Sequence, residues 1–208
     1  MGNNRIQEKN EKSGMGNVLW KFFPWIWMLL GTAYDIWYQI VPGKWIVDSD
    51  LAAEMVLASH LNKTHRILSR DWFYSSELRV FESQWFYRIG LLFSPDNWHV
   101  ARVIAAVLLY VVFIAVILFF AKSIGLQDFA PWMAAIMMWP FGRWYLVYAL
   151  YGTYYIIYML FALVTIGVLF RLNKSGRTDR RKAVLLYAVG FFCAFGSGLN
   201  GIKQTLIF

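Results

Sequence analysis

The length, composition and charge of the chain exclude several classes of protein. Its 208 residues are 59% apolar and only 15% charged, whereas soluble domains average about 25% charged residues. Aromatic residues make up 19%, including 11 Trp and 12 Tyr, more than one soluble core can bury with every N–H and O–H satisfied. The net charge of +8 does not indicate nucleic-acid binding, because six of the 20 basic residues fall at 171–182 between two apolar runs, where the positive-inside bias concentrates them. The lone Cys193 excludes a disulfide framework and a cysteine metal cluster.

Apolar stretches long enough to cross a bilayer recur along the chain. A hydrocarbon core of about 30 Å needs about 20 helical residues. We therefore predict an all-α fold, a polytopic transmembrane helix bundle with spans at residues 18–41, 100–121, 129–150, 151–170 and 183–208. Residues 1–17 are expected to be a polar cytoplasmic tail without a cleavable signal sequence. The membrane domain, 18–208, is still apolar at its last residue and is expected to be incomplete there.

The third and fourth predicted spans are interrupted by turn-forming residues. They abut around Tyr151-Gly152-Thr153, which is typical of a tight helical hairpin. Pro131 and Pro140 lie inside the third span and are expected to bend it, since proline lacks the backbone N–H and clashes with the preceding turn.

The distribution of charge predicts the orientation. Basic residues precede the first span and follow the fourth, and the even number of intervening spans puts both groups on one side, the cytoplasm. Residues 42–99 then form an outer loop. This loop holds seven of the 12 acidic residues, which are Asp48, Asp50, Glu54, Asp71, Glu77, Glu82 and Asp96.

The outer loop is predicted to contain helices that lie in the membrane interface. Residues 51–61 form an Ala- and Leu-rich run after Asp48 or Ser49 as N-cap. A second helix is expected to begin near Ser75, since apolar side chains then follow one helical stripe, at Leu78, Phe81, Trp85 and Leu92. Ser94 followed by Pro95 reads as the cap and first residue of the second span.

Acidic residues just after the first span are the strongest candidates for chemistry. Asp50 and Glu54 are four residues apart and share a helix face. Asp50 lies in the first turn, where unpaired backbone N–H groups favour the ionised carboxylate, so it suits a general base or a cation ligand. The alternative is an ordinary helix cap with a solvated acidic face.

Charged residues inside the apolar runs fall at the depth of this loop. Asp35, Arg102 and Arg143 come out in the outer half of their spans, and Lys203 also falls near the outer surface. Ionisable residues in a membrane are costly and by default mark a substrate or ion pathway. We expect them to form, with the loop acids, one charged pocket that holds a phosphate whose lipid tail stays in the bilayer. Snorkelling side chains and local ion pairs are the alternative.

Two other patterns are weak evidence for a binding site. Gly196-x-Gly198-x-x-Gly201 matches a dinucleotide fingerprint but lacks the strand that such a site requires. His60, His65 and His99 have no zinc-ligand spacing. We predict no metal ligands, although a divalent cation remains open as a cofactor.

Taken together, the residues after the first span resemble a known family. The similarity lies in the Asp48-Ser49-Asp50 sequence, the helix at 51–61, the run from Ser69 to Leu78 and a second span starting Trp98-His99-Val100-Ala101-Arg102. In these features the chain is similar to GT-C-type membrane glycosyltransferases, in particular bacterial protein mannosyltransferases and aminoarabinose transferases. Tyr145–Tyr155 contains no acidic residue, which argues against the metal-dependent oligosaccharyltransferase branch. Family members continue for several more spans, so the resemblance covers their N-terminal part.

The resemblance implies an activity and a role for each candidate residue. Asp50, or Asp48, would be the base that deprotonates an extracytoplasmic acceptor, which is a glycan, lipid or protein. A sugar on a polyprenyl phosphate would be the donor, transferred with inversion. Glu54, Arg102, Arg143 and Lys203 would bind substrate or lipid phosphate. The partners would be membrane lipid and the lipid-linked sugar, and the location the bacterial plasma membrane. The alternatives are a non-catalytic transport or lipid-handling protein and an assembly subunit.

Overall fold

The computed structural model describes residues 3–74, 80–174 and 180–200, and over these ranges every regular element is helical. The all-α prediction is therefore confirmed for the described part of the chain. The elements are α1 (Asn3–Ile40), η1 (Pro42–Trp45), α2 (Ser49–Thr64), α3 (Gln84–Phe93), α4 (Trp98–Ile124), η2 (Gln127–Phe129), α5 (Ala130–Met137), the π-helix η3 (Tyr145–Tyr151), α6 (Ile156–Lys174) and α7 (Arg180–Asn200).

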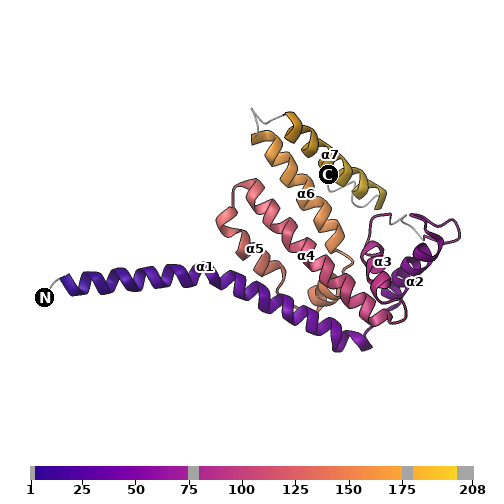
Figure 1. Ribbon diagram of the computed structural model, residues 1–208, viewed down its shortest axis with the longest axis horizontal. Coiled ribbons are helices and arrows are strands. Elements are labelled where there is room, and N and C mark those ends of the chain that lie inside the picture. The colour runs from indigo at the N-terminus through magenta and orange to yellow at the C-terminus, as the bar shows by residue number, and fades with distance from the viewer. Residues whose placement is uncertain (1–2, 75–79, 175–179, 201–208) are drawn as a thin grey trace.

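Helix α4 is the centre of the arrangement (Figure 1). It packs against α1, α3, α5 and α6, while α7 packs on the far side of α6. Helices α2 and α3 lie side by side near the N-terminal end of α4 and the C-terminal end of α1. The N-terminal part of α1 extends well beyond the other helices.

Two apolar clusters hold these helices together. The larger one surrounds the middle of α4, where Leu109, Tyr110 and Phe113 are almost completely buried against α5 and α6. The smaller one joins α2 and α3 to the start of α4. At that junction an added Cβ on Gly90 would lie 2.0 Å from the carbonyl oxygen of Ala101, so only glycine lets α3 approach α4 this closely.

Among the described residues, the helices α4 and α6 are long and apolar enough to cross a membrane. They correspond to the second and fourth predicted spans. The first predicted span lies inside the longer helix α1. Helix α7 covers part of the fifth span up to Asn200, and the rest of that span lies outside the described residues.

The prediction of one continuous helix over 129–150 is wrong. Helix α5 ends at Met137, residues 138–142 are not helical, and a π-helix follows at Tyr145–Tyr151. Pro140 lies in this interruption and accounts for it, because proline supplies no donor N–H and its ring disfavours helical backbone before it. The expected bend is therefore a complete break. The hairpin to α6 turns at 152–155, where Thr153 has a left-handed φ of 58°.

In the outer loop, the first predicted helix is confirmed and the second differs. Helix α2 has Asp48 as N-cap, with the Leu51 N–H donating to Asp48 Oδ1 at 2.8 Å. Helix α3 begins at Gln84, and the expected start near Ser75 lies outside the described residues. On the predicted apolar stripe, Leu92 is 73% exposed, whereas Tyr87 and Leu91 of the same helix are buried.

Helix α4, which contains the second predicted span, begins at Trp98, so the predicted cap at Ser94 and first residue at Pro95 are wrong. Its N-cap is Asn97, whose Oδ1 accepts from the Val100 N–H at 3.2 Å. Pro95 precedes the helix and does not occupy its first turn. Asn97 provides the side-chain acceptor that a helix start requires, which explains the shift.

Candidate functional site

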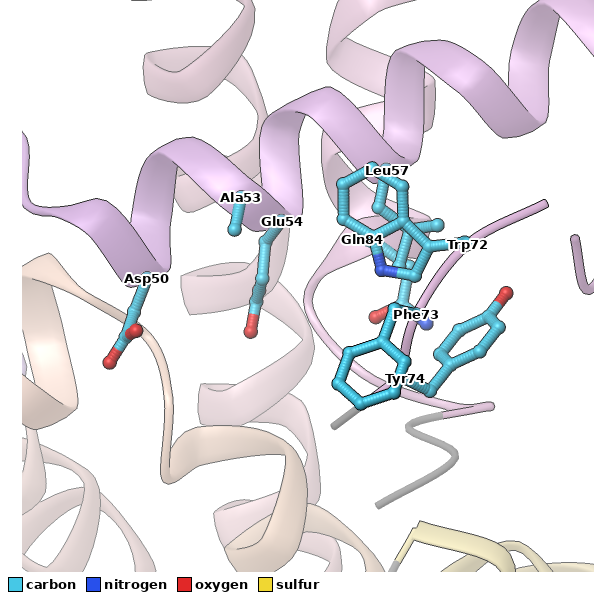
Figure 2. Close-up of a pocket in the computed structure, with 8 residues that line it drawn as sticks. All are labelled: Asp50, Ala53, Glu54, Leu57, Trp72, Phe73, Tyr74 and Gln84. Atoms are coloured by element: carbon cyan, nitrogen blue, oxygen red, sulfur yellow. The ribbon is translucent and has the colours of Figure 1, made fainter. Parts of the chain in front are cut away.

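A pocket of about 200 Å³ lies between α2, the loop that follows it and the start of α3 (Figure 2). Helix α2 contributes two carboxylates and two apolar side chains, the loop three consecutive aromatic rings, and α3 an amide. The lining residues are Asp50, Ala53, Glu54, Leu57, Trp72, Phe73, Tyr74 and Gln84.

The helical spacing of α2 places Asp50 and Glu54 in this pocket together, as predicted. Figure 2 shows both carboxylates pointing from the same side of α2. Asp50 is exposed, whereas Glu54 is only 4% exposed and accepts a hydrogen bond from the hydroxyl of Ser83. The pocket therefore contains one solvent-accessible carboxylate and one that is buried and fixed in position.

Asp48 has a different role from Asp50. Its Oδ1 accepts from the Leu51 N–H and, at 2.6 Å, from the hydroxyl of Tyr154 in the turn before α6. Asp48 does not line the pocket. Its carboxylate caps the N-terminus of α2 and joins this helix to the turn at 152–155.

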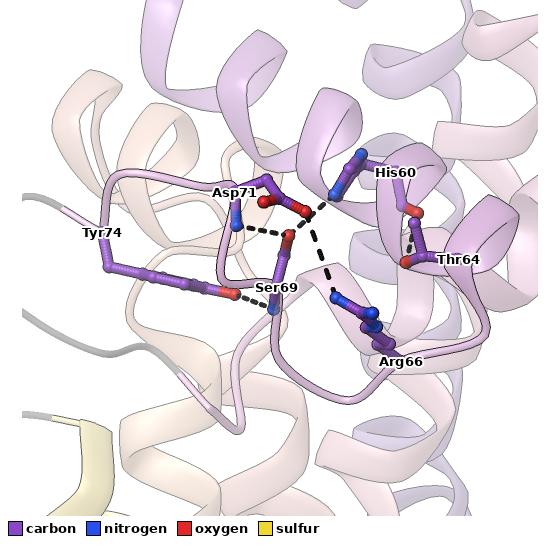
Figure 3. A network of polar contacts seen from close by, with 6 residues as sticks. All are labelled: His60, Thr64, Arg66, Ser69, Asp71 and Tyr74. Atoms are coloured by element: carbon purple, nitrogen blue, oxygen red, sulfur yellow. Dashed lines mark hydrogen bonds and ion pairs between the residues drawn. The ribbon is translucent and has the colours of Figure 1, made fainter.

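Polar contacts fix the aromatic loop to α2 (Figure 3). The buried Ser69 is at their centre: its Oγ lies 2.8 Å from His60 Nε2 and accepts from the Asp71 N–H at 3.1 Å. The Ser69 N–H donates to the hydroxyl of Tyr74 at 2.9 Å. Arg66 and Asp71 form a long ion pair of 4.0 Å. These contacts order the loop that carries the three rings.

Tyr87 of α3 is buried in the smaller apolar cluster. Its hydroxyl lies 3.2 Å from Thr153 Oγ1. Burial raises the pKa of the Tyr87 phenol, and the nearby Glu54 carboxylate raises it further. Tyr87 is therefore a protonated hydrogen-bonding group and not a base.

The expected meeting of acids and cations in one cavity is wrong for this pocket, because its lining contains no Lys or Arg. Arg102 is 1% exposed and faces α1 and η3. Its Nη2 donates to Gln39 O and lies beside His99 Nδ1, both at 3.2 Å, and its guanidinium lies 4.7 Å from the Tyr151 ring centre. Arg143 is exposed, just before η3. Lys203 lies outside the described residues.

Several lining residues were not singled out from the sequence as site residues. Trp72, Phe73 and Tyr74 stood within the run that resembles the glycosyltransferases, but nothing in the run itself showed that the loop folds back on α2. The signal was Ser69, a small polar residue before three aromatic ones. Gln84 becomes a lining residue only because α3 begins there.

No group of three or more His, Cys, Asp or Glu side chains is arranged to hold a metal ion among the described residues. Over its described residues the chain is thus all-helical, with two helices suited to a membrane and an acidic, aromatic pocket on the loop between α1 and α4. The chain matches no protein-family model, and no curated protein or solved structure is significantly similar to it. The resemblance to GT-C-type enzymes accordingly stays a prediction.

Proposed function

We propose that the chain is an integral membrane protein with glycosyltransferase activity. It would move a sugar from a polyprenyl-phosphate donor to an extracytoplasmic acceptor, with inversion. The observation that carries this proposal is the position of Asp50, which is exposed at a pocket lined by a second carboxylate, an amide and three aromatic rings.

The membrane location is supported by the apolar surface. Helices α4 and α6 have the length and composition of spans. Large apolar side chains are also exposed in numbers along α1 and α7, including Trp20 at 65%, Leu29 at 62%, Leu185 at 65% and Phe191 at 72%. Apolar surface of this extent needs a partner or lipid to cover it.

The pocket has the chemistry that a sugar requires. A pyranose ring has an apolar C–H face, which packs on aromatic rings, and a rim of hydroxyls, which bond to carboxylates and amides. The volume of about 200 Å³ is below the roughly 300–1,000 Å³ of pockets for drug-sized ligands, so it suits one ring.

In the proposed reaction Asp50 takes the proton of the acceptor hydroxyl. The acceptor oxygen attacks the anomeric carbon from the face opposite the phosphate, the carbon–oxygen bond to phosphate breaks, and polyprenyl phosphate leaves with the electron pair. Glu54, held by Ser83, would orient the sugar hydroxyls. The leaving phosphate would be met by a cation outside the pocket lining. Of the predicted phosphate-binding cations, Arg143 is exposed and Arg102 is buried.

The test is transfer of label in membranes that contain the full chain. Polyprenyl phosphates bearing radiolabelled hexoses or pentoses are added, and loss of label from the lipid to a new product is measured. We expect transfer by the wild type and a decrease of about 100-fold or more in Asp50→Asn, since a positioned base contributes about 10²–10⁴ in rate. Asp96→Asn, an exposed carboxylate outside the pocket, is the matched control and should retain activity. Undiminished transfer by Asp50→Asn, or none by the wild type, contradicts the proposal.

A further inference from the structure

A buried carboxylate inside the helix bundle is not part of the pocket. Asp35 of α1 is 1% exposed, and neither of its carboxylate oxygens has a hydrogen-bond partner among the described residues. An ionised carboxylate buried without a partner is strongly unfavourable, so the group is either neutralised or bound to a cation.

Gln39, one turn further along the same face of α1, adds a second unpartnered acceptor. Its Nε2 donates to Leu150 O at 3.3 Å, Tyr151 O at 2.9 Å and the Tyr110 hydroxyl at 3.1 Å. Because backbone carbonyls can only accept, these bonds fix the orientation of the amide. Its Oε1 is buried and lacks a partner in the described chain, and residues four apart share one face of a helix.

The interrupted helix between α5 and η3 lies against this face of α1. An added Cβ on Gly31, one turn before Asp35, would lie 2.6 Å from Met138 O at the end of α5. Gln39, one turn after Asp35, contacts the carbonyls at the end of η3. Asp35 therefore lies between these two contacts, on the side of α1 that faces α5 and η3. Carbonyls at the C-terminal end of a helix carry partial negative charge, and interrupted membrane helices use such carbonyls to coordinate cations.

Among the described residues no positively charged side chain forms an ion pair with Asp35, and the buried Nη1 of Arg102 also has no hydrogen-bond partner there. The titratable groups that face Asp35 are the hydroxyls of Tyr110 on α4 and Tyr145 on η3, and α5 carries none. These hydroxyls donate to Leu150 O and Met137 O, respectively. Arg102 donates to Gln39 O, one turn away.

We propose that Asp35, Gln39 Oε1 and the carbonyls at the α5–η3 break bind one monovalent cation. A single carboxylate balances a single positive charge, which distinguishes this site from one for divalent metals. A proton and a sodium ion share this chemistry. A proton would sit on Asp35, whose O–H would donate a hydrogen bond to an acceptor such as Gln39 Oε1. A sodium ion would instead be coordinated by all of these oxygens. The inference is independent of the proposed sugar transfer.

The experiment uses the full chain purified in detergent. Thermal unfolding is followed by tryptophan fluorescence across a pH series, in sodium chloride and in choline chloride at equal ionic strength. Infrared spectroscopy measures the carbonyl band of a protonated carboxylic acid. We expect one of two patterns: a carboxylic acid band that disappears in Asp35→Asn, which assigns a proton, or a Tm raised by several degrees by sodium and not by choline, which assigns a metal ion.

The controls separate this site from the rest of the chain. Asp35→Asn should lose the response, and Asp128→Asn, at an exposed carboxylate of η2, should keep it. Absence of both the band and the sodium effect in the wild type overturns the proposal, as does a response that survives in Asp35→Asn. The wild-type result decides the question if Asp35→Asn does not fold.

Discussion

Asp48 and Asp50 are two positions apart in the sequence, and their surroundings separate a structural from a chemical role. The Asp48 carboxylate accepts hydrogen bonds from the Leu51 N–H and the Tyr154 hydroxyl. Asp50 is exposed beside the pocket. Both residues are exposed, but only Asp50 lines the pocket. Since a base must reach the proton that it takes, the geometry favours Asp50. The surroundings of Arg102 likewise indicate a structural role, because it contacts α1 and Tyr151 and not the pocket.

Asp48→Ala should therefore destabilise the protein without removing a base. It deletes an N-cap, which typically costs about 1 kcal/mol, and it also leaves the Tyr154 hydroxyl without its acceptor. Asp48→Asn should cost less, since asparagine caps helices nearly as well. Denaturant unfolding in detergent measures the difference. Sugar transfer should persist in Asp48→Asn while it is lost in Asp50→Asn, and the reverse order would assign the base to Asp48.

At the scale of elements, the pocket depends on how closely α3 approaches α4. Helix α3 supplies Gln84 to the pocket and Ser83 to Glu54, and it is positioned by the contact of Gly90 with Ala101. The aromatic loop depends in turn on Ser69 and His60. The pocket is thus assembled from separate elements, each fixed by a small number of close contacts.

Gly90→Ala should separate α3 from α4. The new Cβ would lie 2.0 Å from Ala101 O, a backbone atom that cannot move independently, and overpacking of this kind costs about 1–3 kcal/mol. Gly198→Ala is the matched control, since nothing lies within 4 Å of its Cβ and alanine favours a helix by about 0.5–1 kcal/mol over glycine. Thermal unfolding should show a lower Tm for Gly90→Ala and an equal or higher Tm for Gly198→Ala. Equal stability of Gly90→Ala and wild type would mean that the two helices do not pack this closely.

At the scale of the whole molecule, local patterns predicted the helices better than their arrangement. The apolar run at 100–121 and the Asp48 cap predicted α4 and the start of α2, because both depend on residues close in sequence. The sequence also predicted that Asp50 and Glu54 share a face. At Pro140 the sequence predicted only a bend. A helix can continue past a proline when neighbouring helices satisfy the freed backbone groups, and the sequence does not show whether they do. The lining by Trp72 and Gln84 depends on tertiary contacts that no local pattern specifies.

The orientation of the molecule in a membrane gives a last prediction. Helix α4 has 27 residues and at about 1.5 Å per residue is about 40 Å long, which exceeds a hydrocarbon core of about 30 Å. Its two ends should therefore emerge on opposite sides.

Asp96 and Lys122 are exposed at these ends and can each be replaced by cysteine in a Cys193→Ala background. Asp96→Cys should react with a membrane-impermeant maleimide in intact cells, and Lys122→Cys only after permeabilisation, because the basic 171–182 segment should keep the Lys122 side in the cytoplasm. Equal labelling of both positions in intact cells would contradict a membrane-spanning α4, and the opposite pattern would place the pocket in the cytoplasm, where an extracytoplasmic acceptor cannot reach it.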